Sequence, residues 1–154
     1  MRRTLIALST TALVVTPLVA LAAPAEASGH ERVTFVVDTQ FVNAPSDMTG
    51  TGPLESCTQV LDLGGGGVPT GPNTVLFFGA KELQCAGGTV TIEYEATMNF
   101  RKGRRTSGTW WVVESTLPGV TGGGGQLKGD NERCTLEAGS EGCILDTFTG
   151  FVHG

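Results

Sequence analysis

Glu93 and Glu95 are the first candidates for chemistry in this sequence, because they flank Tyr94 in the run from Thr89 to Phe100. Two carboxyl groups on one side of a strand are the kind of pair that hydrolysis or proton transfer uses. The competing interpretation places both glutamates in solvent, since buried carboxylates need partners that the sequence does not identify. Tyr94 lies on the apolar side of the run, where its hydroxyl could orient a ligand or be satisfied within the core.

Trp110 and Trp111 are adjacent, so in a strand one ring points inward and the other outward. The inward ring is expected in the core, and the outward ring could contact a sugar, a lipid or a partner chain. The residues expected to bind a ligand are Tyr94, Trp111, Phe35 and Ile92. No catalytic residue is assigned.

Nucleophilic catalysis by a serine triad is nearly excluded. His30 and His153 lie at the two ends of the mature chain, and there is no G-x-S-x-G motif. The glycine tetrads at 64–67 and 122–125 do not lead into G-K-[ST], so they are expected to be flexible loops rather than phosphate cradles. We therefore expect no cofactor.

The four cysteines predict disulfide bonds rather than a metal site. An even number of cysteines in an exported chain is typical of disulfides, and no pair has C-x-x-C spacing. Three connectivities are possible. We favour Cys57 with Cys85 and Cys134 with Cys143, because each pair brackets a local excursion of the chain.

Residues 1–27 have the features of a secretory signal peptide. Arg2 and Arg3 precede an apolar stretch, and Ala25-Glu26-Ala27 has the A-x-A form of a cleavage site. We expect a secreted protein whose mature part, 28–154, is a single domain without a membrane span. Its eight Lys and Arg against fourteen Asp and Glu give a formal charge of −6, which argues against a nucleic-acid partner.

Short strands with period-2 alternation are expected to carry these residues. The most regular is Thr89 to Phe100, where Val90, Ile92 and Tyr94 share one face. The other expected strands are 32–41, 57–63, 73–85, 110–115, 126–129 and 144–152, with Gly79 as a bulge. The expected loops are 43–53, 64–72, 101–107 and 119–125, and no helix is expected in the mature chain.

Seven or eight short strands with glycine-rich turns predict an all-β fold, either a small antiparallel barrel or a two-sheet β-sandwich. A secreted immunoglobulin-like sandwich of the chromophore-carrier type also fits the small size, the acidity and two disulfides. Composition does not choose between these architectures.

Three patterns in order resemble the allene oxide cyclase barrel and its dirigent-like relatives. They are the glycine turn and alternating strand C-A-G-G-T-V-T-I-E-Y from Cys85, Gly108-Thr109-Trp110 with the glycines that follow it, and D-T-F-T-G from Asp146. The chain departs from the family at residues 115–118, where relatives carry G-T-G and an aromatic residue. The resemblance implies an eight-stranded antiparallel barrel with a mostly apolar lumen, often in a homo-oligomer.

The resemblance also implies that a small hydrophobic molecule binds in the lumen, and in some relatives is guided through cyclisation or coupling. The expected function is therefore binding of a small hydrophobic ligand. One alternative is a cofactor-free cyclase or isomerase of dirigent type, which predicts polar side chains converging inside an apolar cavity. The other is an extracellular interaction module with a filled barrel, whose outward tryptophan and basic turn near Arg101 meet a partner.

Overall fold

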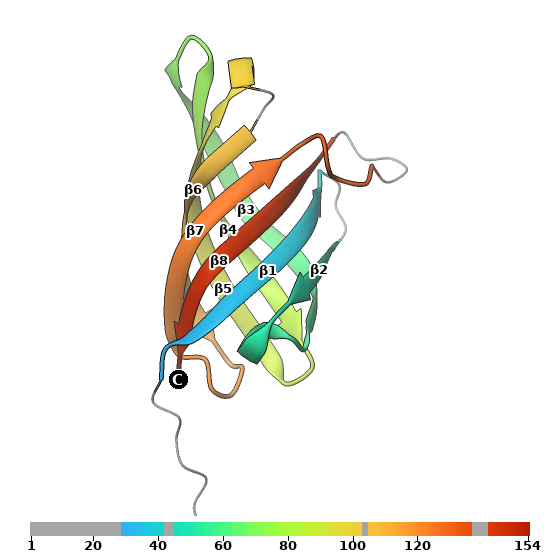
Figure 1. The fold of residues 1–154 in the computed structure, drawn as a ribbon, viewed down its shortest axis with the longest axis vertical. Coiled ribbons are helices and arrows are strands. Elements are labelled where there is room, and N and C mark those ends of the chain that lie inside the picture. Colours follow the sequence, from blue (N-terminus) through green and yellow to red (C-terminus); the bar gives the residue numbers. More distant parts are fainter. Residues whose placement is uncertain (1–28, 42–44, 103–104, 137–141) are drawn as a thin grey trace, which may run out of the picture.

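The computed structural model describes residues 29–41, 45–102, 105–136 and 142–154; the expected signal peptide at 1–27 lies outside this part of the chain. Eight antiparallel strands follow one another around a closed barrel, and β8 pairs with β1 to complete it (Figure 1). The all-β barrel is thereby confirmed, and the two-sheet sandwich is excluded. The strands are β1 (Glu31–Gln40), β2 (Ser46–Gly50), β3 (Cys57–Gly71), β4 (Thr74–Cys85), β5 (Gly88–Asn99), β6 (Arg105–Ser115), β7 (Gly122–Asp130) and β8 (Cys143–His153).

Helical structure is limited to short turns in the described residues. They contain two three-residue 3₁₀ helices, η1 (Gly52–Leu54) and η2 (Phe100–Lys102). No helix in the described part of the chain is long and apolar enough to cross a bilayer.

The alternation predicted for the first and fifth strands is confirmed. Val33, Phe35 and Val37 of β1 have no exposed surface, and Val90 and Ile92 of β5 are equally buried. Between the inward residues of β5, Glu93 and Glu95 are exposed, as the register of a half-buried strand requires. These strands direct one face into the lumen and the other into solvent.

The first glycine tetrad, expected to be a loop, is part of β3. Gly64 to Gly67 pair with Ala80 to Phe77 of β4. A Cβ atom at Gly66 would lie 3.0 Å from the Phe78 ring, and one at Gly67 would lie 3.0 Å from the Phe77 ring. Glycine therefore leaves room for aromatic rings of the neighbouring strand, and the β3–β4 hairpin extends beyond the rest of the barrel (Figure 1).

The bulge expected at Gly79 of β4 lies instead on the neighbouring strand, β3. Gly79 pairs regularly with Tyr94, whereas β3 shifts register between Asp62 and Gly64. Gly64 has φ +119°, in the left-handed region that glycine adopts most readily. The register shift therefore lies in β3, at the start of the glycine tetrad.

The second glycine run is also strand rather than loop. β7 begins at Gly122, and Gly124 and Gly125 pair with β6 on one side and β8 on the other. A Cβ at Gly124 would lie 2.7 Å from the carbonyl oxygen of Trp110, so the backbones approach too closely for a side chain. The expected loop at 43–53 likewise contains β2, and β6 begins at Arg105, within the expected basic turn.

One end of the barrel is filled by aromatic and aliphatic side chains. It is the end at which the C-terminus lies (Figure 1). The rings of Phe35 and Phe148 stack with their centroids 4.4 Å apart, and Trp110 meets Phe35 edge-on at 5.2 Å. The indole nitrogen of Trp110 donates to the carbonyl oxygen of Thr149 at 3.3 Å, which satisfies its buried donor. Buried side chains from the connecting segments complete this core, namely Leu54, Leu117 and Val120.

Both expected disulfides are present. Cys57 and Cys85 join β3 to β4 where the two strands pair, and Cys57 is buried in the core. Cys134 and Cys143 tie the segment after β7 to the start of β8. One disulfide therefore closes the packed end of the barrel, and the other lies at the opposite end.

Candidate functional site

The end of the barrel opposite the packed core contains a cavity of about 780 Å³. The strands place small or apolar residues around its wall, and the described residues of the mouth include Gln40 and Phe41. The glycines of β3 contribute to the space because they carry no side chains into it. The apolar part of the wall is formed by Phe77, Phe78, Ala96, Met98, Leu127 and Ile144.

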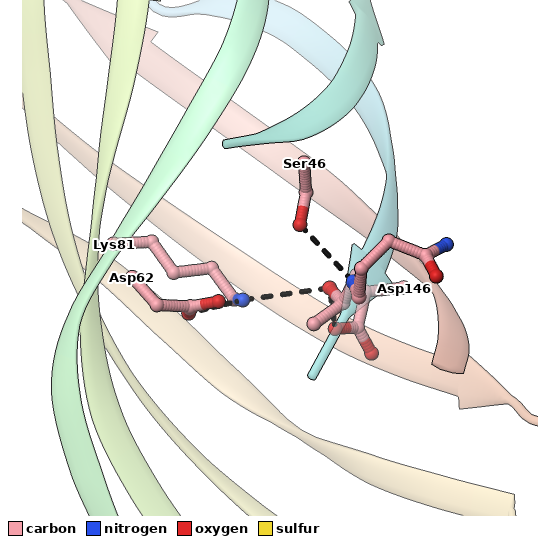
Figure 2. Close-up of polar contacts among 6 residues, drawn as sticks. Ser46, Asp62, Lys81 and Asp146 are labelled. Carbon is pink, nitrogen blue, oxygen red and sulfur yellow. Dashed lines mark hydrogen bonds and ion pairs between the residues drawn. The ribbon is translucent and has the colours of Figure 1, made fainter. Parts of the chain in front are cut away.

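A group of polar side chains crosses the lumen between the cavity and the packed core. Lys81 of β4 and Asp62 of β3 come from one wall, and Thr39 of β1 and Asp146 of β8 come from the other (Figure 2). We call Asp62, Lys81, Thr39 and Asp146 the polar bridge. It forms a charged floor beneath an otherwise largely apolar cavity.

Lys81 is the centre of the polar bridge. Its side chain is only 2% exposed, because β4 directs position 81 inward in phase with the core residue Leu83. The ammonium group lies 2.7 Å from the carboxylate of Asp62 and donates to the Thr39 hydroxyl at 3.4 Å. The buried cation is therefore paired, as burial of a charge requires.

Asp146 is the second carboxyl group of the floor. It is 7% exposed and accepts a hydrogen bond at Oδ2 from the Thr39 hydroxyl at 2.8 Å. Burial raises the pKa of Asp146 to about 6, and the nearby Lys81 charge and the Thr39 hydrogen bond oppose that rise. Its carboxyl group can thus take up or release a proton near neutral pH.

Tyr94 of β5 lies on the wall beside the polar bridge. Its ring centroid is 5.7 Å from the Lys81 ammonium, and a Cβ at Gly79 would lie 2.8 Å from its hydroxyl oxygen. Gly79 therefore makes room for the tyrosine. Burial, followed by the charges of Asp62 and Asp146, raises the pKa of Tyr94 to about 12, so the hydroxyl stays protonated at neutral pH.

Thr106 of β6 contributes a polar atom without a partner. Among the described residues nothing hydrogen-bonds to its buried Oγ1, although Thr106 forms part of the cavity wall. Cross-strand pairing places Thr106, Gly129 and Asp146 side by side on β6, β7 and β8. The unpaired hydroxyl therefore belongs to the same corner of the cavity as the Asp146 carboxyl group.

The segment after β7 is attached to the rim of the cavity. The side-chain amide of Gln40 donates to the carbonyl oxygen of Thr135 at 2.6 Å, and the carboxylate of Asp38 accepts from the Thr135 amide at 3.1 Å. The Cys134–Cys143 disulfide anchors the same segment to β8. Asp38 is also close to both sulfur atoms, but these form a disulfide and offer no thiolate to a metal.

The structure does not bring the four expected ligand-binding residues together. Tyr94 lines the cavity, whereas Phe35 and Ile92 lie in the packed core with no exposed surface. Trp110 is the inward tryptophan, and Trp111 lies on the outer surface, where its indole nitrogen donates to Glu93 at 3.2 Å. Trp111 borders a shallow external groove and is absent from the lumen cavity.

Sequence reasoning missed the polar bridge and Thr106. Period-2 alternation contained part of the signal, because Asp146 shares its strand face with Phe148 and Lys81 shares its face with Leu83. A charged residue in phase with core residues is uncommon without a buried partner. That phase relation could have identified both residues as candidates, although not their partners on other strands.

No family model, curated protein or solved structure matches this chain.

Proposed function

We propose that this protein is secreted and binds a small hydrophobic molecule in the lumen of its barrel, as the allene oxide cyclase and dirigent-like barrels that it resembles do. The cavity of about 780 Å³ above the polar bridge is the observation that carries the proposal. Its size falls within the range of small-molecule sites, which are mostly apolar with a few polar groups that orient the ligand. Tyr94 and Asp146 line the cavity and would take that role in this proposal.

The filled-barrel alternative predicts no cavity, so the open end of the lumen favours ligand binding over a purely external interaction surface. The two disulfides are compatible with export to an oxidising compartment. Assembly into a homo-oligomer remains a prediction from the family resemblance.

Filling the cavity with a side chain tests the proposal. Ala96 is buried and lines the cavity, whereas Thr97 is exposed on the other face of β5. We expect Ala96→Trp to weaken binding of an apolar fluorescent probe by at least tenfold, and Thr97→Trp to leave it unchanged. Equal probe binding by the two variants, both shown to be folded by circular dichroism, would place the ligand outside the lumen.

Native mass spectrometry of the protein from culture supernatant gives an independent reading. It reports signal cleavage, oligomeric state and any small molecule that stays bound. We expect a retained apolar molecule in the wild-type protein and its loss in Ala96→Trp.

A cofactor-free cyclase or isomerase is the second candidate function. It is favoured by the convergence of polar side chains inside an apolar cavity, with Asp146 of pKa about 6 beside Lys81 and Tyr94. A carboxyl group with this pKa can both donate and accept a proton at neutral pH. Conversion of the retained molecule to an isomer during incubation, absent in Asp146→Asn, would distinguish catalysis from binding alone.

A further inference from the structure

We propose that the polar end of the ligand is a protonated amine, held by the carboxylate of Asp146 and the hydroxyl of Thr106. This inference rests on the proposed lumenal site and specifies the chemical class that the site accepts. The ligand would be an amphiphilic amine, with its apolar body against the cavity wall and its ammonium group at the floor.

The charge of the cavity supports a cationic ligand. Its titratable lining residues among the described chain are Asp62, Lys81, Tyr94 and Asp146. Lys81 balances one carboxylate, and the tyrosine hydroxyl is neutral, so ionisation of both aspartates leaves one uncompensated negative charge. A ligand ammonium group would neutralise that charge, whereas a ligand carboxylate would increase it.

Lys81 is already engaged by residues of the chain. Its ammonium group pairs with Asp62 at 2.7 Å, donates to Thr39 and lies over the Tyr94 ring. A carboxylate ligand would have to compete with Asp62 for this cation. The occupied lysine therefore does not favour an acidic ligand.

Asp146 and Thr106, in contrast, have acceptor capacity left over. The hydrogen bond that Asp146 accepts goes to Oδ2, and no described residue donates to Oδ1. The hydroxyl of Thr106, a residue only 8% exposed, has no partner in the described part of the chain. Buried polar atoms are normally paired, so the unpaired Thr106 hydroxyl, next to an Asp146 oxygen that accepts no bond from the described residues, indicates a missing partner.

The two oxygens converge on one point. A Cβ placed on Gly129 would contact the hydroxyl oxygen of Thr106 and would lie 2.8 Å from Oδ1 of Asp146. It would also lie 2.6 Å from Cδ1 of Ile144, so this point is already crowded and an ammonium group would have to reach the two oxygens from the cavity side. An ammonium group has three N–H donors, enough for both oxygens and one further acceptor.

The apolar wall beside this corner suits the body of an amphiphile. Leu127 and Ile144 come from the strands that carry Gly129 and Asp146, and Ala96 and Met98 come from β5. These side chains surround the cavity above the charged floor. An alkyl chain that leaves the amine towards the mouth would contact them and gain free energy from burial.

Binding should depend on the charge of Asp146. The groups that face this carboxyl are Lys81 from β4, Asp62 from β3, Thr39 from β1, Tyr94 from β5 and Thr106 from β6. An alkylamine stays protonated well above neutral pH, like a lysine. As pH rises from 5 to 7, Asp146 ionises and amine affinity is expected to rise by about tenfold, because the carboxylate form binds the cation.

Three probes with the same chain and different head groups test the inference: octylamine, octanoate and 1-octanol. Isothermal titration of the disulfide-bonded protein at pH 7 is expected to show octylamine binding at least tenfold more tightly than the other two. Asp146→Asn should remove most of this preference and its pH dependence. Thr106→Val is expected to weaken octylamine binding by several-fold.

The outcomes separate this inference from the proposed function. Tightest binding of octanoate, equal binding of all three probes, or an amine preference unaffected by Asp146→Asn would overturn the amine assignment and leave the lumenal site in place. Failure of all three probes and of the fluorescent apolar probe would overturn both. Thermal melting of each variant shows that a lost signal does not come from unfolding.

Discussion

The two ends of this barrel are built from the same strands but filled in opposite ways. At the packed end, β1, β6 and β8 direct Phe35, Trp110 and Phe148 into the lumen, where their rings contact one another. At the open end, β1 and β8 contribute Thr39 and Asp146 at inward positions. The barrel wall is continuous, so the size and polarity of the inward side chains decide where the lumen is empty.

The apolar core and the cavity therefore occupy different heights of one lumen. Large apolar side chains at the packed end exclude water and stabilise the closed sheet. The polar bridge then separates that core from the cavity, with Lys81 reaching from one wall towards Thr39 on the other (Figure 2). The cavity therefore has a charged floor, and the core beneath it stays buried.

The largest expected effect on stability comes from removing a side chain at the packed end. We expect Trp110→Ala to lower the free energy of unfolding by about 3–5 kcal/mol, because a fully packed side chain would leave a cavity. Met98→Ala, at the open end, is expected to lower it by about 2 kcal/mol, the lower end of the range for such truncations, since Met98 already borders the cavity. Urea denaturation of both variants gives the comparison, and similar losses at the two positions would contradict it.

The two disulfides sharpen the comparison between the ends. Their sequence separations are 28 and 9 residues, so loss of Cys57–Cys85 is expected to destabilise by about 3.5 kcal/mol and loss of Cys134–Cys143 by about 2.5 kcal/mol. Urea denaturation of the Cys57→Ser/Cys85→Ser and Cys134→Ser/Cys143→Ser variants measures the two losses.

Loss of the two disulfides should affect probe binding in the reverse order. The segment tied by Cys134 contacts Gln40 at the cavity rim, whereas Cys57 lies in the core. We therefore expect the Cys134→Ser/Cys143→Ser variant to show weaker probe binding than the variant lacking the other bridge. The opposite ranking of probe affinities would show that the rim segment has no part in the site.

The packed end could be predicted from sequence more completely than the open end. Alternation in β1 and β5 identified Phe35 and Ile92 as inward residues, and cysteine spacing identified both disulfides. Alternation reports which face a residue occupies but not its height along the lumen. For that reason the sequence predicts Phe35 and Ile92 as ligand-binding residues together with Tyr94, although only Tyr94 of these three lines the cavity.

Other features of the fold depend on contacts between strands. Gly66 and Gly67 are strand residues because rings from β4 cover them, and composition alone predicts a loop. Lys81 and Asp146 are buried together because barrel closure brings β8 to β1, whose Thr39 contacts both. Neither relation appears in the local pattern from which strands and loops are predicted.

The pH dependence of stability tests whether the charge at the open end destabilises the fold. Because the folded pKa of Asp146, about 6, lies above the unfolded value of 3.8, folding favours the protonated carboxyl group. The stabilisation from this group is complete below pH 3.8 and is lost as pH rises through 6, a loss on the order of 3 kcal/mol. Asp146→Asn, which can still accept the Thr39 hydrogen bond, is expected to abolish this part of the pH dependence.

The measurement is the free energy of unfolding of wild type and Asp146→Asn at several pH values between 4 and 8. The difference between the two proteins isolates Asp146 from the exposed carboxyl groups that titrate in both. The asparagine variant should gain stability relative to wild type as pH rises, because it keeps a neutral side chain where wild type must bury a charge. A constant difference across this range would mean that the ionised carboxylate is as stable in the folded barrel as in water, and that the polar bridge compensates it fully.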